Sequence, residues 1–125
     1  MTHQVVIRGT YERTVPVRFT TIAITDVVTA YDNTRLVTGM TIANETATAR
    51  RADIHYYDGA TDWLVWSESV GANSAINVPL LLRLYNGDKM KITAEAANAL
   101  TVKPDVLIVD PKVGIQLADN FSIDT

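Results

Sequence analysis

The sequence predicts an all-β fold: a single antiparallel β-sandwich, Ig-like or jelly-roll-like, with extended N- and C-terminal arms. Apolar residues alternate with polar ones along most of the chain, in segments rich in Val, Ile, Thr and Tyr, whereas helical periodicity is hard to find. Asn-Gly, Asp-Gly and other polar clusters separate these segments, as turns separate strands. The length of 125 residues, with 47% hydrophobic and 20% charged residues, suits one domain with one core.

The alternating segments lie in the middle of the chain. We expect residues 15–110 to form the sandwich domain. Residues 1–14 and 111–125 carry scattered apolar residues with little periodicity, so we interpret them as an N-terminal and a C-terminal arm. The C-terminal arm is too sparse in apolar residues for a core of its own, yet too apolar for a free tail. It is expected to pack either on the parent domain or on a neighbouring subunit.

At the start of the domain the apolar residues change from odd-numbered to even-numbered positions. Val15, Val17 and Phe19 share one face of an extended chain. Ile22 and Ile24 share the other face. A bulge or strand break between the two sets would keep both of them in the core, so we expect a bend there.

Two further alternating runs, residues 35–44 and 52–56, are expected to pair with each other. The polar turn Asn44-Glu45-Thr46 follows the first run, and Asp58-Gly59 follows the second. The expected core positions are Leu36, Met40, Ile42, Ala52, Ile54 and Tyr56.

The segment DWLVWSESV contains both tryptophans of the chain. Trp63 and Trp66 are three residues apart, so in a strand they point to opposite faces. We expect one to be buried and the other to be exposed. The exposed tryptophan is interpreted either as partly covered by a loop or as a protein contact, because large aromatic side chains carry much interface energy.

Residues 82–94 predict a hairpin. Ile76, Val78, Leu80, Leu82 and Leu84 fall on one face, which we expect to be in the core. A proline at position 79 cannot donate a ladder hydrogen bond, so this segment is either an edge strand or two strands. The Asn-Gly pair at positions 86–87 fits a two-residue hairpin turn, after which the apolar positions 90, 92 and 94 continue one face.

The last alternating run, residues 102–109, is apolar at both parities near its end. Val102, Val106 and Ile108 share one face, but Leu107 and Val109 on the other face are apolar too. This pattern is typical of a strand covered on both sides, and we expect a central strand.

Residues suited to catalysis or metal binding are scarce. The chain has no cysteine, and its only histidines are His3 and His55. His55 lies in a predicted strand, where a surface histidine is the simpler interpretation. The loop DGATD lacks the further oxygen ligands of a calcium loop, so we interpret it as a turn. We expect no catalytic residue, no cofactor-binding or metal site and no cofactor, and therefore not an enzyme.

The charge pattern argues against some partners. A net charge of −3 gives no large basic field for nucleic acid, and no apolar stretch approaches the roughly 20 residues that cross a bilayer. Basic residues dominate the start of the chain and aspartates dominate the end, which indicates either solvated arms or complementary contacts between copies. The candidate interface residues are Arg8, Arg13, Arg18, Trp63, Ile115, Leu117, Phe121 and Ile123.

The stretches YYDGATDW and VGANSAINVPLLLRLYNGDKMKITAEAANALTVKPDVLIV resemble small β-sandwich virion proteins of tailed bacteriophages, over residues 35–109. The matching features are VGANS before a Pro-Leu strand, a Gly-Asp pair and then AANA before a closing strand. These motifs are structural, so the resemblance implies a component of the phage particle and not an activity.

The hypothesis that follows is a capsid decoration, or cement, protein. It would be made in the host cytoplasm, lie on the outer surface of the head, form a homo-oligomer with a trimer favoured, and bind the major capsid protein or other virion proteins. The alternatives are a neck, tail or fibre-associated component, or a carbohydrate-binding module. In the last case Trp63 or Trp66 would stack on sugar, with Tyr56, Tyr57 and Asp58 nearby.

Overall fold

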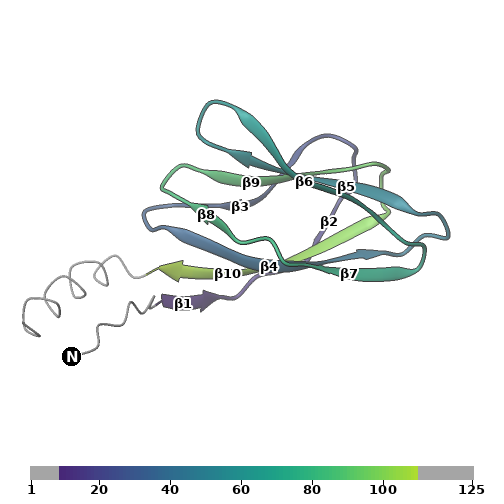
Figure 1. The fold of residues 1–125 in the computed structure, drawn as a ribbon, viewed down its shortest axis with the longest axis horizontal. Helices are drawn as coiled ribbons and strands as arrows, with labels where there is room; N and C mark the ends of the chain where they lie inside the picture. Colours follow the sequence, from purple (N-terminus) through teal and green to yellow (C-terminus); the bar gives the residue numbers. More distant parts are fainter. Residues whose placement is uncertain (1–8, 110–125) are drawn as a thin grey trace, which may run out of the picture.

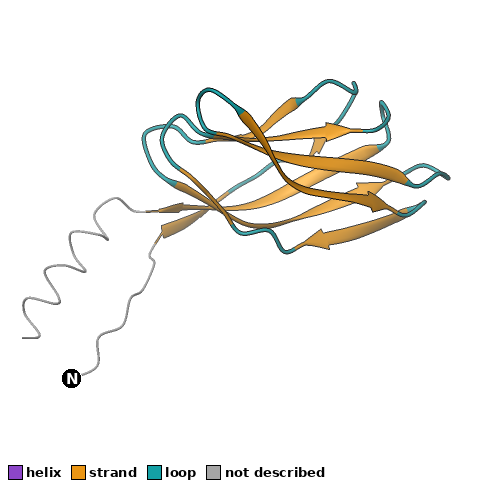
Figure 2. Ribbon diagram, turned by 45° about the horizontal axis from the view of Figure 1, so that its top comes forward, coloured by secondary structure: helices purple, strands orange, loops and turns teal. Residues whose placement is uncertain are grey.

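The computed structural model describes residues 9–109, which contain ten strands and no helix. The strands form two antiparallel sheets that pack face to face (Figure 1 and Figure 2). This arrangement confirms the predicted all-β sandwich. The strands are β1 (Gly9–Glu12), β2 (Val17–Arg18), β3 (Thr25–Thr29), β4 (Arg35–Asn44), β5 (Arg50–Tyr57), β6 (Asp62–Val70), β7 (Ser74–Val78), β8 (Leu82–Leu84), β9 (Lys89–Ala94) and β10 (Leu100–Val109).

The strand pairing follows one rule, in which early strands pair with late ones. Sheet A has the order β1-β10-β4-β7, with β2 also beside β10 and β8 also beside β4. Sheet B has the order β3-β9-β5-β6. The chain is therefore one long hairpin, rolled so that successive strand pairs alternate between the two sheets. This is the jelly-roll arrangement, one of the two sandwich types that the sequence left open.

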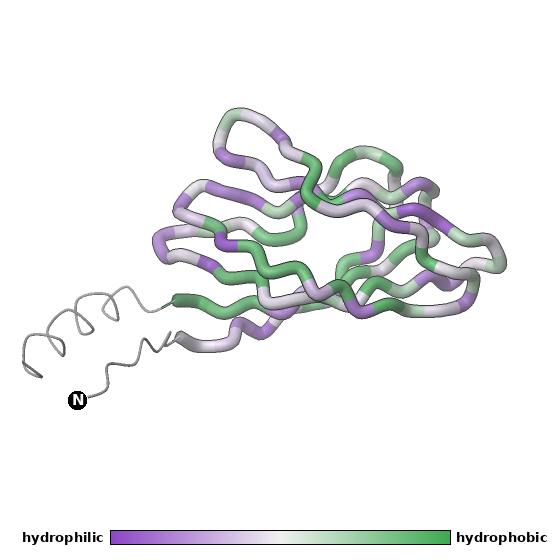
Figure 3. Tube along the Cα trace, viewed as in Figure 1, coloured by the Kyte–Doolittle hydropathy of each residue, from purple (hydrophilic) through white to green (hydrophobic). Residues whose placement is uncertain are grey.

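The core lies between the inner faces of the two sheets. Figure 3 shows the alternation of hydrophobic and hydrophilic residues along the strands that produces these faces. The expected core positions Ile54, Ile92 and Met90 are fully buried, as are Ile42 and Leu84. Each large side chain of this kind contributes roughly 1.5–3 kcal/mol when it leaves water. The parity of the apolar residues therefore predicted these inner faces correctly.

The hydrogen-bonding pattern of sheet A is interrupted along one line that crosses all of its strands. We call this line the crease. On one edge, residues 13–16 separate β1 from β2, and on the other edge residues 79–81 separate β7 from β8. Between them the register of β10 against β4 shifts beyond Asp105, because Thr38 is an extra residue in β4. The predicted division of the strand near Pro79 is confirmed.

Pro104 explains the break between β1 and β2. The Thr14 hydroxyl donates to the Pro104 carbonyl at 2.6 Å, so this carbonyl faces the β1/β2 edge. In an antiparallel ladder the N–H and C=O of one residue face the same neighbour, and proline has no N–H to give. The ladder therefore stops opposite Pro104, and a threonine side chain replaces the missing main-chain partner.

Two predicted strand pairings are wrong. β4 belongs to sheet A and β5 to sheet B, so the runs at 35–44 and 52–56 are not neighbours. β8 and β9 likewise lie in different sheets, so residues 82–94 do not form a hairpin. The Asn-Gly pair there has a positive φ only at Gly87, at 92°, and Asp88 N–H donates to Tyr85 O at 2.8 Å. One positive φ at the third position fits a type II turn, which here joins the sheets.

The start of the domain also differs in part from expectation. β1 pairs with β10 in sheet A, although its residues were assigned to the N-terminal arm. The expected bend is present after Phe19, where the chain crosses from sheet A to sheet B. Phe19 is 1% exposed, but Ile22 and Ile24 are exposed and not in the core. The bend thus carries the chain from one sheet to the other. The apolar residues before and after it therefore do not have to face the same side of one strand.

One tryptophan is exposed as expected, but the other is only partly buried, and the prediction that the two point to opposite faces is wrong. Trp66 packs against the core and Trp63 is 55% exposed. The pairing of β5 with β6 skips Val65, so Trp66 lies opposite Ile54 and Trp63 opposite Tyr56. Opposed residues share a face, so the bulge at Val65 places both indoles on the inner side of the sheet. Trp63 is exposed because the β5–β6 hairpin projects beyond the rest of the sandwich (Figure 1).

Candidate interaction surfaces

The outer face of sheet B is covered by charged and polar side chains that bind one another. Lys91 lies 3.1 Å from Asp62 and 4.0 Å from the centroid of the Tyr57 ring. Lys89 lies 2.9 Å from Asp26, and this hydrogen bond raises the pKa of Lys89. Surface pairs of this kind contribute about 0–1 kcal/mol each. They neutralise the face locally and leave few charges for a partner.

The same face holds the predicted strand histidine. His55 Nε2 lies 3.2 Å from the Thr93 hydroxyl on the adjacent strand. Further along, Arg51 donates to Asp53 at 3.3 Å and to Ser67 at 2.8 Å, and the Ser67 hydroxyl donates to Asp53. His55 thus occupies a surface position between strands.

The turn at Asp58 holds the exposed indole of Trp63. Asp58 accepts hydrogen bonds from the N–H groups of Thr61 and Ala60, at 2.8 and 2.9 Å, and from the Trp63 indole at 3.0 Å. These bonds, that of Thr61 foremost, lower the pKa of Asp58. Because Asp62 is paired with a lysine, both carboxylates of the loop are engaged, as expected of a turn.

The aromatic residues near Trp63 do not form one stacking platform. Tyr56 lies opposite Trp63 and shares its side of the sheet, whereas Tyr57 points to the other side. The Tyr56 hydroxyl donates to Asp88 at 2.5 Å. This bond, aided by burial, raises the pKa of Tyr56 to about 12. The residues of the carbohydrate hypothesis are therefore divided between two faces, and one of them is bound to the β8–β9 turn.

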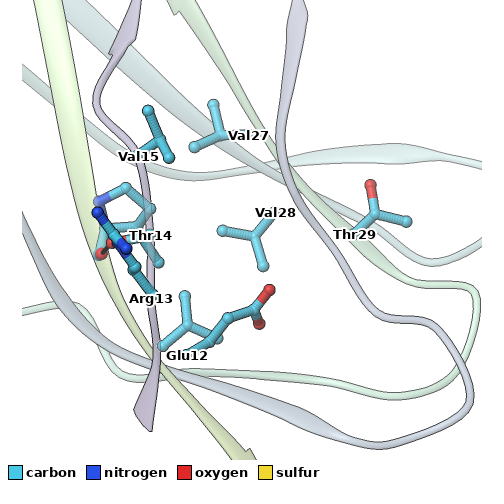
Figure 4. Close-up of a pocket in the computed structure, with 9 residues that line it drawn as sticks. Glu12, Arg13, Thr14, Val15, Val27, Val28 and Thr29 are labelled. Carbon is cyan, nitrogen blue, oxygen red and sulfur yellow. Dashed lines mark hydrogen bonds between the residues drawn. The ribbon is translucent and has the colours of Figure 1, made fainter.

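A cleft opens between the sheets at the edge where β3 faces the β1–β2 connection (Figure 4). It has a volume of about 250 Å³, below the roughly 300–1,000 Å³ of usual ligand pockets. Val15, Val27 and Val28 line it together with Glu12 and Arg13. The predicted interface residue Arg13 thus lines a small cleft in which charged and hydroxyl side chains are mixed with valines.

The other predicted interface residues lie apart from one another. Arg18 pairs with Glu45 at 3.4 Å and donates to Asn98 O at 3.2 Å, so it joins β2 to loops of its own domain. Trp63 lies on the hairpin at the opposite edge of sheet B from β3. The remaining candidates lie outside the described residues: Arg8, Ile115, Leu117, Phe121 and Ile123. Their contacts remain predictions.

A set of surface residues that was not among the candidates lies on the outer face of sheet A. It crosses four strands in register, and we call it the outer row: Tyr11, Leu107, Leu36 and Arg83. Tyr11 was expected in the N-terminal arm, and Leu36 was expected to share a face with Met40 and Ile42. The signal that could have found the row was the pair of adjacent apolar residues in each long strand, Leu36-Val37 and Val106-Leu107. Adjacent apolar residues in a strand serve both faces.

Within residues 9–109 the structure shows no group of three or more His, Cys, Asp or Glu side chains that could hold a metal ion. The same residues contain no helix long and apolar enough to cross a membrane.

No protein-family model and no curated protein sequence matches the chain. Among solved structures, a chain described as "Bacillus endospore appendages form a novel family of disulfide-linked pili" aligns with a TM-score of 0.53 and 13% identity, over 82% of this chain and 90% of that one. Two chains of a pentameric capsid protein isolated from metagenomic phage sequences align with a TM-score of 0.47 each, at 19% and 20% identity, over 78% of this chain.

These similarities concern the fold. The chain covers 62% and 60% of the two capsid chains, so it spans about three fifths of their length. At 13% identity the alignment with the pilus chain shows a shared fold alone, and one fold serves many unrelated functions.

Proposed function

We propose that this chain is a non-enzymatic structural protein of a tailed-phage virion, and specifically a capsid decoration protein that bridges and stabilises capsid subunits. It lies on the outer surface of the head, binds the major capsid protein and forms a homo-oligomer, for which we favour a trimer. The proposal builds on the resemblance of residues 35–109 to small virion sandwiches.

The observation that carries the proposal is the placement of the two chain ends. Gly9 and Val109 are paired residues of β1 and β10, so the first and the last described residues lie side by side at one end of the sandwich (Figure 1). A rigid block with two adjacent arms of opposite charge can hold itself against neighbouring copies or shell subunits. An enzyme would instead need a site of converging polar groups.

The physical basis of decoration is multivalency. A block that contacts two shell subunits gains from the high effective concentration of the second contact. It binds the assembled shell and not the separated subunits, so by mass action it stabilises the assembled state alone. A small contribution per copy becomes large when it is summed over a lattice.

The pilus similarity suggests a different assembly, but one feature of the chain argues against it. The matching structure is described as disulfide-linked, and the present chain has no cysteine. A covalent linkage of that kind is therefore not open to it.

The proposal is tested with purified particles that carry or lack the protein. Particles without it are expected to release their genome at a lower temperature, with unchanged shell geometry. Copy number is the second readout, because decoration needs hundreds of copies whereas a neck ring needs about a dozen or fewer. Equal release temperatures, or a location confined to the neck, tail or fibre, would favour those alternatives.

The C-terminal arm provides a second test. We propose that Ile115, Leu117, Phe121 and Ile123 lie against another subunit. Truncation after Asp110 is then expected to leave a folded domain, with a circular dichroism spectrum of the same shape, and to weaken assembly. A truncated protein that decorates particles as well as the full chain would contradict this.

A further inference from the structure

The crease divides sheet A into two halves whose outer faces differ. The half with β1, the end of β10, the start of β4 and β8 carries the outer row. The other half presents small and polar residues, such as Thr41, Ala43 and Asn77. Sheet B, in turn, presents the paired charges described above. The row is therefore the apolar part of the outer face of sheet A within residues 9–109, whereas in sheet B the exposed Leu64, opposite His55 on edge strand β6, adds one apolar side chain to the charged face.

The outward direction of the row follows from its neighbours. Val37 and Val106 are 0% and 1% exposed and point into the core. Leu36 and Leu107 are adjacent to them in their strands, so they point away from the core. Tyr11, opposite Leu107, shares this outer face and is 69% exposed.

Leu36 is only 8% exposed although it faces outward, so Tyr11 and the partly exposed Leu107 are the accessible apolar side chains of the row. The row thus has an aromatic residue at one end and the exposed Arg83 at the other. Ordered surfaces with tyrosine and arginine are typical of the energetic centres of protein interfaces.

We propose that the outer row is the docking site for the C-terminal segment, residues 110–125, of a second copy of this chain. This inference deepens the proposed function and rests on it for the assembly in which docking occurs. It names where the apolar residues of the arm bind.

The composition of the segment fits the row. In the segment, Ile115 and Leu117 alternate with polar or small residues, so an extended stretch presents both to one flat apolar surface. The segment also carries three aspartates and one lysine, a net charge of −2, which complements the arginine at the end of the row.

The point at which residues 110–125 begin also favours docking on a second copy. β10 ends at Val109, two residues beyond Leu107, so the segment starts next to the row. Asp110 precedes Pro111, and the residue before a proline favours extended backbone. This favours continuation of the chain away from its own row, whereas docking at home would require an immediate reversal. An extended chain gains roughly 3.3–3.6 Å per residue, so the segment is long enough to reach a neighbouring domain.

Cysteine cross-linking tests the proposal directly, because the natural chain has no cysteine. One preparation carries Tyr11→Cys, and a second, with a mass tag, carries Leu117→Cys. The two are mixed and oxidised. The matched control replaces Tyr11→Cys by Lys103→Cys, an exposed position on the same face of β10 but beyond the crease.

We expect the tagged disulfide-linked dimer to form several-fold faster with Tyr11→Cys than with Lys103→Cys. Both substitutions are at exposed positions, and unchanged melting temperatures would verify folding. Equal rates at the two positions would overturn the proposal. So would a double variant that links only within one chain, because the segment would then dock at home.

A second measurement does not depend on disulfides. Leu107→Glu places a charge in the row, and we expect it to weaken self-association in sedimentation experiments as much as removal of residues 110–125 does. Combining both changes should add little, since they remove the same contact. Additive effects would overturn the proposal. Because both tests use purified protein, docking can be confirmed even if the protein proves absent from the head surface, and the converse also holds.

Discussion

The turns at Asp58-Gly59 and Asn86-Gly87 look alike in sequence but are held together differently. The first closes the β5–β6 hairpin within sheet B, and the Asp58 side chain supplies most of its hydrogen bonds. The second joins the two sheets and is bound to the loop after β3. There, Gly87 N–H donates to Ala30 O at 3.0 Å, and Ala30 N–H donates to Asp88 O at 3.0 Å. One turn is local, whereas the other depends on distant residues.

This difference determines how many other contacts are lost when a substitution distorts each turn. A local turn can distort without loss of tertiary contacts, but the second turn cannot move without disturbing both sheets. Substitutions at the two turns should therefore differ in their cost to stability.

The largest effect is expected for Asp88→Ala. Asp88 is 7% exposed and accepts hydrogen bonds from the Tyr56 hydroxyl and from Tyr85 N–H. Its removal leaves two donors without partners, which costs about 3 kcal/mol of unfolding free energy. Chemical denaturation measures this. Asp88→Asn, which keeps an acceptor, is the matched control and should lose clearly less.

Gly87→Val is expected to lower the free energy of unfolding by about 2 kcal/mol, because a β-branched residue is strained at a φ of 92°. Gly59→Val is the matched comparison, at a φ of 99°. A Cβ at either glycine meets no atom within 4 Å, so both costs come from the backbone. We expect Gly59→Val to shift the thermal midpoint less, since the hairpin tip can relax. Equal shifts would remove the distinction between the turns.

Tyr56→Phe tests the link between the hairpin strand and the second turn. Loss of the Tyr56 hydroxyl, and with it the hydrogen bond to Asp88, is expected to lower the free energy of unfolding by about 1 kcal/mol at neutral pH. The folded state raises the pKa of Tyr56 to about 12, so it favours the neutral phenol. The resulting stabilisation is complete below the ordinary pKa of 10 and is lost as pH rises through about 12. A stability profile from pH 9 to 12 should therefore fall more steeply in the natural protein than in the variant.

Asp58→Asn should have the smallest effect on stability, and its signature is local. The folded state lowers the pKa of Asp58, so its stabilising contribution is present above the ordinary carboxyl pKa and is lost as pH falls through the lowered value. We expect Trp63 fluorescence to change in that acidic range in a Trp66→Phe background. With Asp58→Asn this transition should be absent. An unchanged transition would show that another group controls the indole.

The sequence predicted which residues face the core better than it predicted which strands pair. Alternation identified Ile54 and Ile92, because burial of one sheet face leaves a period of two in the chain itself. The Asn-Gly turn was assigned to a hairpin because a glycine with positive φ serves a hairpin and an inter-sheet turn equally well. Only the distant partners of β8 and β9 distinguish them, and those are tertiary information.

Bulges also made the sequence pattern misleading about the face on which single residues lie. The extra residue Thr38 reverses the parity of β4, so Leu36 shares a pattern with Met40 but faces outward. The bulge at Val65 likewise places both tryptophans on one side. For the candidate site, the charge pattern made Arg13 and Arg18 interface candidates, and their role stays a prediction, whereas the outer row arises only when four strands are aligned. No single segment of sequence contains that alignment.

The crease also bears on the behaviour of the protein at high concentration. Long unbroken strand edges act as templates on which other chains add, and such addition leads to aggregation. In sheet A both edges are cut into pieces of two to five residues, with proline at positions 16 and 79 in the gaps. In the proposed decoration role, copies of the protein lie close together on a lattice. The edges of sheet A then give a neighbouring copy no continuous ladder to extend, and in sheet B the long edge strand β6 carries the bulge at Val65.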